Sequence, residues 1–426
     1  MKKWIAFLLA ALMLLSLTAC GGTNPAADTT PEAEAVEAAP EAAPAEEAAE
    51  PEAEIETEPE PEPEAEEEVR AVTVTDMSGD EVTITGEVES IVNLWPAGTS
   101  SFFVMGAGDL ITAMAVNNAG IINSWCKVFY PAAADIPAMG GTTPAVEELL
   151  NLDPDLVIVH PMTVSDGYAQ QVRDAGIPAI NINFSTYDTM ITSYTMLGEA
   201  LGGEYQEKLD TWCEMIAEKQ AATEAITADL GDDDRPVVYY IAGQADSLTT
   251  TMGANSICAD WTRLAGGVYA TTLMDEPNTT EVTAEELFAI DPDVIIVGGT
   301  YQHQLVEELQ STDGWKDLSA VVNGRVYTNP YGAFAWDRFG LESYFQMDYA
   351  LMCIQPELAE ENGIDRASLT QEVIDFYEMM NGTLLTEEQV GYMIDGLEPD
   401  GSMNDPAGSA SGEASGSASG EVKAAA

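Results

Sequence analysis

The stretch that decides the fold is EELLNLDPDLVIV, residues 147–159, which returns as EELFAIDPDVIIV in residues 285–297. The identical positions are, in the first copy, Glu147, Glu148, Leu149, Asp153, Pro154, Asp155, Ile158 and Val159. Each copy has the pattern of a short amphipathic helix, an Asp-Pro break and a continuous apolar strand. Such a strand must be covered on both faces, as in a parallel sheet. The repeat therefore predicts the same α/β unit twice, in two lobes with a cleft between them.

The sequence around the first copy alternates strands with helices. A hairpin is predicted for residues 72–75 and 82–85, which alternate apolar and polar side chains around the turn sequence MSGD. Further strands are predicted at 90–94, 111–116, 156–159 and 179–182, and helices at 145–152 and 167–175. This alternation is typical of an α/β lobe, which we assign to residues 70–186.

A helical segment is predicted between the lobes. Residues 187–230 contain no Pro, and their apolar side chains recur at helical spacing. The pair Gly202-Gly203 could kink or break this segment. We expect one long helix, or two helices in line, and roughly forty residues at about 1.5 Å each would span about 60 Å.

The second lobe is assigned to residues 231–398. Besides the second copy of the repeat, strands are predicted at 237–241 and 326–328, and helices at 256–264, 341–354 and 369–379. The predicted fold class is α/β, with two Rossmann-like lobes of mainly parallel sheets joined by a long α-helix.

The two ends of the 426-residue chain are not expected to belong to these lobes. Lys2 and Lys3 precede an apolar run at 4–17 and the sequence LTACG at 17–21, which indicates a secretory signal in residues 1–20. The sequence LTACG resembles a bacterial lipobox, which implies a diacylglyceryl group on the thiol of Cys20. An uncleaved signal anchor is the alternative, although the apolar run is short for a membrane span.

The remaining terminal segments are interpreted from their amino-acid composition. Residues 25–68 are almost wholly Ala, Pro and Glu, so residues 21–69 are predicted to form an extended acidic tether. Residues 399–426 are predicted to be a disordered Gly/Ser/Ala tail. The net charge of -60 argues against nucleic acid as a partner and against general adsorption to anionic lipid. Solubility of a surface protein is the alternative explanation of this charge.

Besides Cys20, the chain has Cys126, Cys213, Cys258 and Cys353. Their even number permits disulfides in an oxidising compartment. No pair has the spacing of a metal site, and two of the four lie in helical patterns. Buried free thiols are therefore an equally good interpretation.

The chain resembles the substrate-binding proteins of ABC importers, in the class with two α/β lobes joined by a rigid helix. The resemblance covers roughly residues 72–357 and rests on the order of several short motifs. They are the two copies of the repeat, TDMSG at 75–79, LAGG at 264–267, NGRVY at 323–327 and WDR at 336–338. The class carries iron–siderophore complexes, haem and cobalamin, so the resemblance implies a chelate carrier without a cofactor of its own. The expected cargo is an iron–siderophore complex, and haem, cobalamin or an oxyanion on the same scaffold is the alternative.

The resemblance also implies partners and a location. Members of the class dock on a permease dimer with a cytoplasmic ATPase through one exposed Glu on each lobe, and the matching positions are Glu147 and Glu285. A Glu in the first turn of a helix can instead complement the helix dipole, which we prefer for Glu148 and Glu286. The protein is expected to be a monomer outside the cytoplasm, held on the cell membrane by lipid on Cys20.

Ligands of open α/β sheets gather at the carboxyl ends of the strands. Aromatic groups with a few polar tips suit a large chelate, which needs stacking area and some orienting hydrogen bonds. The predicted ligand-binding residues are Trp95, His160, Gln244, Tyr301, His303, Tyr331, Trp336 and Arg338.

Each of these residues also has a structural interpretation. Trp95 and Trp336 could pack between the lobes, and Tyr331 could anchor a loop. Arg338 could bind a ligand carboxylate or pair with a neighbouring Asp or Glu. The two histidines, His160 and His303, could ligate haem iron, donate hydrogen bonds to a chelate or bond the local backbone. A free-ion site is not expected, because such sites use several His and carboxylates.

Two other classes of function remain open. An enzyme would need a nucleophile with its base, or paired acids, and the sequence has no GxSxG, Walker or HExxH motif. The glycine loop MGAGD at 105–109 lacks the third Gly of the dinucleotide pattern. We therefore predict a binding protein without catalytic activity, and a surface sensor or adhesion protein or a hydrolase remain the alternatives.

Overall fold

The computed structural model describes residues 70–118, 120–243 and 247–403. The chain divides into two compact units, and the second, Glu67–Ala426, contains all of these residues. The predicted signal peptide, Cys20 and the acidic tether lie outside the described residues, as does the tail beyond residue 403. No helix within the described ranges is both long and apolar enough to cross a membrane.

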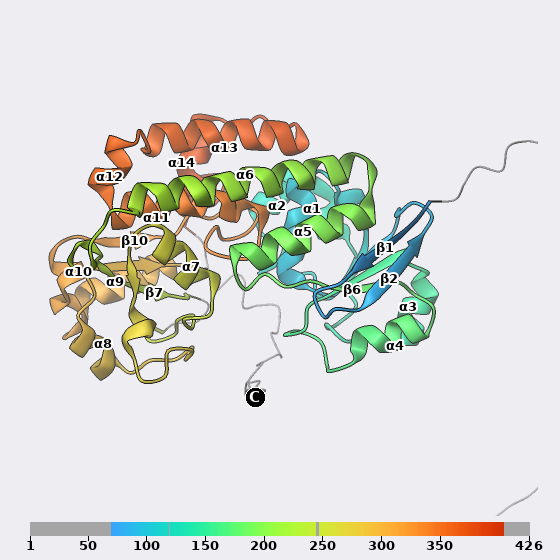
Figure 1. Ribbon diagram of the computed structural model, residues 1–426, viewed down its shortest axis with the longest axis horizontal. Coiled ribbons are helices and arrows are strands. Elements are labelled where there is room, and N and C mark those ends of the chain that lie inside the picture. The colour runs from blue at the N-terminus through green and yellow to red at the C-terminus, as the bar shows by residue number, and fades with distance from the viewer. Residues whose placement is uncertain (1–69, 119, 244–246, 404–426) are drawn as a thin grey trace, which may run out of the picture. The chain divides into compact units, whose positions relative to one another are not determined.

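Strands and helices alternate along the chain (Figure 1). The first lobe contains β1 (Ala71–Thr75), β2 (Glu81–Thr85), β3 (Ile91–Asn93), α1 (Thr99–Val104), β4 (Ile111–Met114), α2 (Ser124–Phe129), α3 (Val146–Leu152), β5 (Leu156–Val159), α4 (Tyr168–Asp174) and β6 (Ala179–Asn181). Two helices follow, α5 (Tyr187–Leu201) and α6 (Gly203–Thr227). The second lobe contains β7 (Val237–Ile241), α7 (Ile257–Leu264), β8 (Val268–Tyr269), α8 (Ala284–Ile290), β9 (Val294–Val297), α9 (Gln302–Ser311), α10 (Ser319–Val322), β10 (Val326–Thr328), α11 (Gln346–Ile354), α12 (Pro356–Glu361), α13 (Arg366–Asn381) and α14 (Glu387–Ile394).

The two sheets have the same topology, which confirms the predicted duplication. The first sheet has the order β4-β3-β5-β6 and the second the order β10-β9-β7-β8, and all neighbouring strands in them are parallel. The repeated strands β5 and β9 occupy equivalent central positions. The predicted hairpin forms separately, with β1 and β2 antiparallel.

Both faces of each repeated strand are covered, as the apolar sequence predicts. In β5, Leu156 and Ile158 join the large core that contains α1 and α5, whereas Val157 and Val159 join a second core against α4. The same alternation occurs in β9, where Val294 and Ile296 face the large core. The large core contains residues of both sheets, so the two lobes share one continuous apolar interior.

The Asp-Pro-Asp break performs the same task in both copies. Asp153 and Asp291 end their helices in the left-handed conformation, with φ of 48° and 52°. The second Asp of each copy then anchors a neighbouring strand: Asp155 Oδ2 accepts from the N–H of Ser90 at 2.8 Å, and Asp293 Oδ2 from that of Val237 at 2.8 Å. The repeated residues thus end the helix and fix the start of the adjacent strand.

The helices between the lobes correct one prediction. Instead of one rod or two helices in line, α5 and α6 pack side by side (Figure 1). The chain reverses at Gly202, whose φ of 72° and ψ of -173° suit glycine alone. From there α6, about 37 Å long at 1.5 Å per residue, runs on to the second lobe, where it contacts α7 and α11. The first residue of α5, Tyr187, also contacts that lobe, because its hydroxyl donates to the carbonyl of Ser343 at 3.1 Å.

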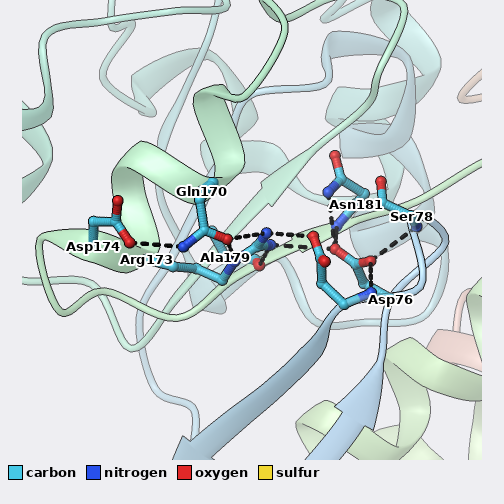
Figure 2. A network of polar contacts seen from close by, with 8 residues as sticks. Asp76, Ser78, Gln170, Arg173, Asp174, Ala179 and Asn181 are labelled. Atoms are coloured by element: carbon cyan, nitrogen blue, oxygen red, sulfur yellow. Dashed lines mark hydrogen bonds and ion pairs between the residues drawn. The ribbon is translucent and has the colours of Figure 1, made fainter.

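The β1–β2 hairpin is fastened to the first sheet by one buried carboxylate (Figure 2). Asp76 accepts hydrogen bonds from Asn181 Nδ2 at 2.8 Å and from the N–H of Ser78 at 2.8 Å. Arg173 of α4 reaches the same carboxylate at 3.3 Å and also contacts Asp80 at 2.5 Å. Because Asp76 is fully buried, this network replaces the water that the charge loses.

The C-terminal helices return to the first lobe. Trp125 of α2 donates from Nε1 to the carbonyl of Leu397 at 2.9 Å, and Asn381 of α13 donates from Nδ2 to that of Phe103 at 3.3 Å. Asn123 donates to the carbonyls of Gly332 and Ala333, both at 3.0 Å. The lobes are therefore connected by buried hydrogen bonds as well as by α6.

All four cysteines outside the signal segment are buried free thiols in the structure. Of the two interpretations that the sequence allowed, disulfides or buried free thiols, the structure agrees with free thiols. Burial raises the pKa of Cys126 and of Cys353 to about 12, so both stay protonated at neutral pH.

Candidate ligand-binding site

Aromatic rings gather where the strands of the first sheet end. Trp95 lies two residues beyond β3 and His160 directly after β5, and their rings stack with centroids 4.8 Å apart. Phe184, beyond β6, meets the Trp95 ring edge-on, also at 4.8 Å. Three neighbouring parallel strands thus supply one aromatic group at the edge where α/β sheets bind ligands.

The second lobe adds Phe339 to this group. Its ring meets that of Trp95 edge-on at 5.6 Å, and the ring of Phe334 lies 6.3 Å from it. Phe339 has a φ of 60°, a left-handed conformation that costs a non-glycine residue about 1–2 kcal/mol. Strain of this kind persists where the surroundings impose it, often at functional sites. The aromatic cluster, defined as Trp95, His160, Phe184, Phe334 and Phe339, therefore spans both lobes.

His160 is held in one orientation by the turn that follows it. Its Nδ1 accepts the backbone N–H of Met162 at 3.2 Å, and its own carbonyl accepts the N–H of Thr163 at 2.9 Å. The side chain is only 5 % exposed, and burial lowers its pKa to about 4. The imidazole is therefore neutral at pH 7.

Arg338 lies in a buried polar network, in the segment between β10 and α11. Its Nε donates to Asp337 Oδ1 at 2.8 Å, and its Nη2 to Asp337 Oδ2 at 3.1 Å and to the Tyr240 hydroxyl at 2.7 Å. The pairing with Asp337 is one of the two structural roles that the sequence allowed. Nη1 is buried and has no hydrogen-bond partner among the described residues. One end of the guanidinium group thus keeps its hydrogen-bonding capacity.

A glycine makes room for this network. Gly298 follows β9 at the position that corresponds to His160 in the repeat. A Cβ atom there would lie 2.4 Å from both the Tyr240 hydroxyl and the Asp337 carboxylate. The first lobe therefore places an imidazole where the second places a buried Tyr-Asp-Arg network, and the two halves of the site are chemically different.

Two other predicted residues lie beyond β9. Tyr301, half-buried, precedes α9, and its N–H donates to the carbonyl of Gly243 at 3.1 Å. His303 is half-buried and lies 3.1 Å, through Nε2, from the carbonyl of Gly396. Within the described ranges neither the Tyr301 ring nor the His303 ring stacks on a ring of the aromatic cluster. Gln244 lies outside the described residues.

Tyr331 and Trp336 belong to the large core. The ring of Trp336 lies 4.8 Å from that of Phe345, and the N–H of Tyr331 donates to the carbonyl of Met393 at 2.8 Å. The hydrogen bond of Tyr331 matches its interpretation as a loop anchor. Phe345 belongs to the same lobe as Trp336, so this contact is not the packing between the lobes that was considered for Trp336. Their predicted role in ligand binding stays a prediction.

Phe184, Phe334 and Phe339 are not among the ligand-binding residues predicted from the sequence. Phe184 could have been found, because the rule used for the other strand ends applies equally to β6. Phe334 and Phe339 lie in an irregular loop after β10, and no periodic pattern indicates which way its side chains point. Among the residues that the structure describes, no three His, Cys, Asp or Glu side chains lie close enough to hold a metal ion.

Glu147 and Glu285 are exposed and occupy the first turns of α3 and α8. Both helices run into the repeated strands through a short break, so their N-termini lie toward the carboxyl edge of each sheet. Glu286, in contrast, bonds the N–H and hydroxyl of Thr283 in a capping box. This capping role supports the structural interpretation of the second Glu in that copy.

Comparisons with known proteins agree with this architecture. The family described as periplasmic binding protein matches residues 95–331, more than half of the chain. An uncharacterised ABC transporter substrate-binding lipoprotein of Bacillus subtilis, YvrC, is 27 % identical over 265 residues, which cover 61 % of this chain and 78 % of YvrC. The Fe(3+)-citrate-binding protein YfmC of the same organism is 28 % identical over 240 residues, covering 54 % and 73 %.

Among solved structures, a periplasmic solute binding protein of Veillonella parvula aligns with a TM-score of 0.63 at 22 % identity. The alignment covers 78 % of this chain and 99 % of that protein, and it shows a shared fold. The family match runs from Trp95 of the first lobe to Tyr331 of the second. The chain therefore belongs to the periplasmic binding protein family and has the two-lobed fold of its helical-backbone class.

Proposed function

We propose that the protein is the extracytoplasmic substrate-binding component of an ABC importer and that it carries a metal chelate, an iron–siderophore complex. The chelate binds between the lobes, and the protein delivers it to a permease. Carrying the chelate requires no covalent chemistry. The family membership and the Fe(3+)-citrate-binding relative support this proposal.

The observation that carries the proposal is the aromatic cluster at the strand ends. Its members come from both lobes, so a ligand that stacks on them also contacts both halves of the protein. Arg338, beside Phe339, adds a buried cation with one unused end. Stacking surface and a few polar groups are what a large anionic chelate needs for recognition.

The proposal assigns the permease contacts to Glu147 and Glu285. Each is exposed at the start of one of the two repeated helices, so each lobe would place one carboxylate against an arginine of the permease dimer. Charge pairs of this kind orient the encounter and raise its rate. Lipid on Cys20 would keep the protein close to the permease.

The test is a tryptophan-fluorescence titration of a protein that begins at Glu67, the start of the compact unit. The ligands are ferric citrate, ferric siderophores, haem, cobalamin and simple oxyanions. Because Trp95 lies in the aromatic cluster, an iron chelate should quench emission saturably at micromolar concentration or below. Trp95→Phe should remove most of the quenching. Trp315→Phe, in a separate core beside Phe288, should retain it.

Saturable binding of haem, cobalamin or an oxyanion with no iron–siderophore response would overturn the choice of cargo and keep the transport role. No response to any of these ligands would contradict chelate transport. It would favour a surface sensor or adhesion role on the same fold.

A further inference from the structure

We infer that His160 recognises an oxygen atom of the ligand by donating a hydrogen bond from Nε2, and that it does not ligate the metal. This inference rests on the proposed function and narrows the ligand class. The cargo would be a chelate whose own anionic oxygen atoms complete the coordination of the metal. The ligand would then not be a haem whose iron is ligated by a histidine.

The first step is the tautomer of His160. A backbone N–H can only donate, so the contact from Met162 at 3.2 Å requires a lone pair on Nδ1. In a neutral imidazole the proton then resides on Nε2. The turn after β5 holds this arrangement, because the N–H groups of Thr163 and Val164 both reach the carbonyl of His160, at 2.9 and 3.3 Å.

The second step is the charge of the ring. The side chain is buried and stacked on Trp95, and burial alone accounts for its lowered pKa. Neutral imidazole is therefore the form that meets the ligand. Within the described residues nothing accepts a hydrogen bond from Nε2, so this N–H remains available as a donor.

Metal ligation would demand the opposite tautomer. Nε2 can bind a metal only through its lone pair, and the proton would then move to Nδ1. Nδ1–H would face the N–H of Met162, and two donors would meet where a hydrogen bond now exists. The backbone of the turn therefore favours an oxygen acceptor over a metal at Nε2.

The other histidine, His303, also carries a proton on Nε2. His303 lies 3.1 Å through Nε2 from the carbonyl of Gly396, which can only accept, so its Nε2 also carries a proton. These are the only two histidines of the chain. Neither ring presents an Nε2 lone pair to a ligand.

The second lobe also offers a donor. Arg338 is 2 % exposed, and its Nη1 has no partner in the described part of the chain, while Asp337 and Tyr240 occupy Nε and Nη2. A guanidinium group has no acceptor atom. Arg338 and His160 therefore both favour ligand oxygen atoms such as those of carboxylate, hydroxamate or catecholate groups.

The tautomer can be measured without any ligand. In a protein that begins at Glu67 and carries 15N-labelled histidine, long-range proton–nitrogen correlations distinguish Nε2–H from Nδ1–H. Both imidazoles should show the Nε2–H form at pH 7, and a His303→Gln variant assigns the two signals. Nδ1–H at His160 would overturn the inference whatever the protein binds.

Ferric citrate serves as the probe for the liganded state. On binding, its iron absorption should keep its position, because no protein nitrogen enters the coordination sphere. His160→Leu should weaken binding about tenfold, the usual size for one hydrogen bond, and His160→Gln, which retains an N–H donor, should recover part of the loss. Val322→Ala should leave affinity unchanged, because that side chain is 70 % exposed on α10 and lies outside the proposed site.

The outcomes separate the two proposals. A shifted iron absorption that disappears in His160→Gln would show metal ligation and overturn the inference, while transport of a chelate would stand. Equal affinity of wild type and His160→Leu would overturn the donor role alone. If neither ferric citrate nor any other chelate binds the wild type, the proposed function fails and the ligand part of the inference fails with it.

Discussion

At the scale of single residues, Glu342 couples stability to pH. This carboxyl is buried and accepts hydrogen bonds from the N–H groups of Ala333 and Phe334, at 3.0 and 2.7 Å, and from the Tyr377 hydroxyl. Burial raises its pKa from the ordinary 4.5 to about 7. The folded state therefore keeps a proton that the unfolded state releases between these two values. The free energy of unfolding should fall as pH rises through this window, by at most about 3 kcal/mol, and level off above pH 7.

His160 changes the free energy of unfolding with the opposite sign, in an overlapping pH range. Its pKa is about 4 when folded and near 6.5 when unfolded, so its contribution to stability rises with pH there. Urea unfolding from pH 4.5 to 8 should therefore be compared between wild type and Glu342→Gln. In Glu342→Gln, the free energy of unfolding should lose the contribution that falls as pH rises. Glu378→Gln, which changes an exposed residue of α13, should keep the same pH dependence as the wild type. Parallel curves for wild type and Glu342→Gln would show that Glu342 does not titrate in this range.

Some residues of the candidate site could be predicted from the sequence and others could not. Trp95 and His160 were found because they follow apolar strands, and the structure stacks them together. Phe339 was missed, because its position depends on a left-handed residue in an irregular loop. The sequence did not decide whether Arg338 binds a ligand or pairs with neighbouring residues. Only the folded chain brings Tyr240 and Asp337 to the guanidinium group.

At the scale of elements, α3 and α8 carry the docking prediction. Glu147→Arg combined with Glu285→Arg should reduce uptake by cells by more than about tenfold, because each change turns attraction to a permease arginine into repulsion. Ligand affinity should stay unchanged. Glu148→Arg, also exposed in the first turn of α3, is the matched control for Glu147→Arg and should transport normally. A large loss of ligand affinity in the double variant would contradict the docking role.

Most strands could be predicted within one or two residues, because the two parallel sheets bury them as short apolar runs between turn signals. The strand β8 was missed, since two residues after Gly266-Gly267 are too few to form a pattern. The pairing of α5 with α6 was also missed. Helical periodicity identifies a helix, but the direction of the chain after it depended on the backbone angles of Gly202.

At the scale of the whole compact unit, the connections between the lobes predict a small closure on ligand binding. A single long helix between the lobes would by itself limit such a closure. In the structure α5 packs on α6 in place of a single rod. Hydrogen bonds of Asn123, Trp125 and Asn381 also connect the lobes, and those of Asn123 are buried. A continuous apolar core underlies them. Large rotation would break these contacts without new partners for the buried polar groups.

Small-angle scattering of the protein that begins at Glu67 should therefore give the same radius of gyration, within error, with and without a saturating chelate. Trp125→Phe with Asn381→Ala removes two of the interlobe hydrogen bonds and retains most of the apolar contact. This variant should show a larger change on ligand addition than the wild type does, because fewer hydrogen bonds between the lobes then oppose rotation. A wild-type profile that contracts strongly would mean that the lobes rotate despite these contacts, as in binding proteins with flexible hinge strands.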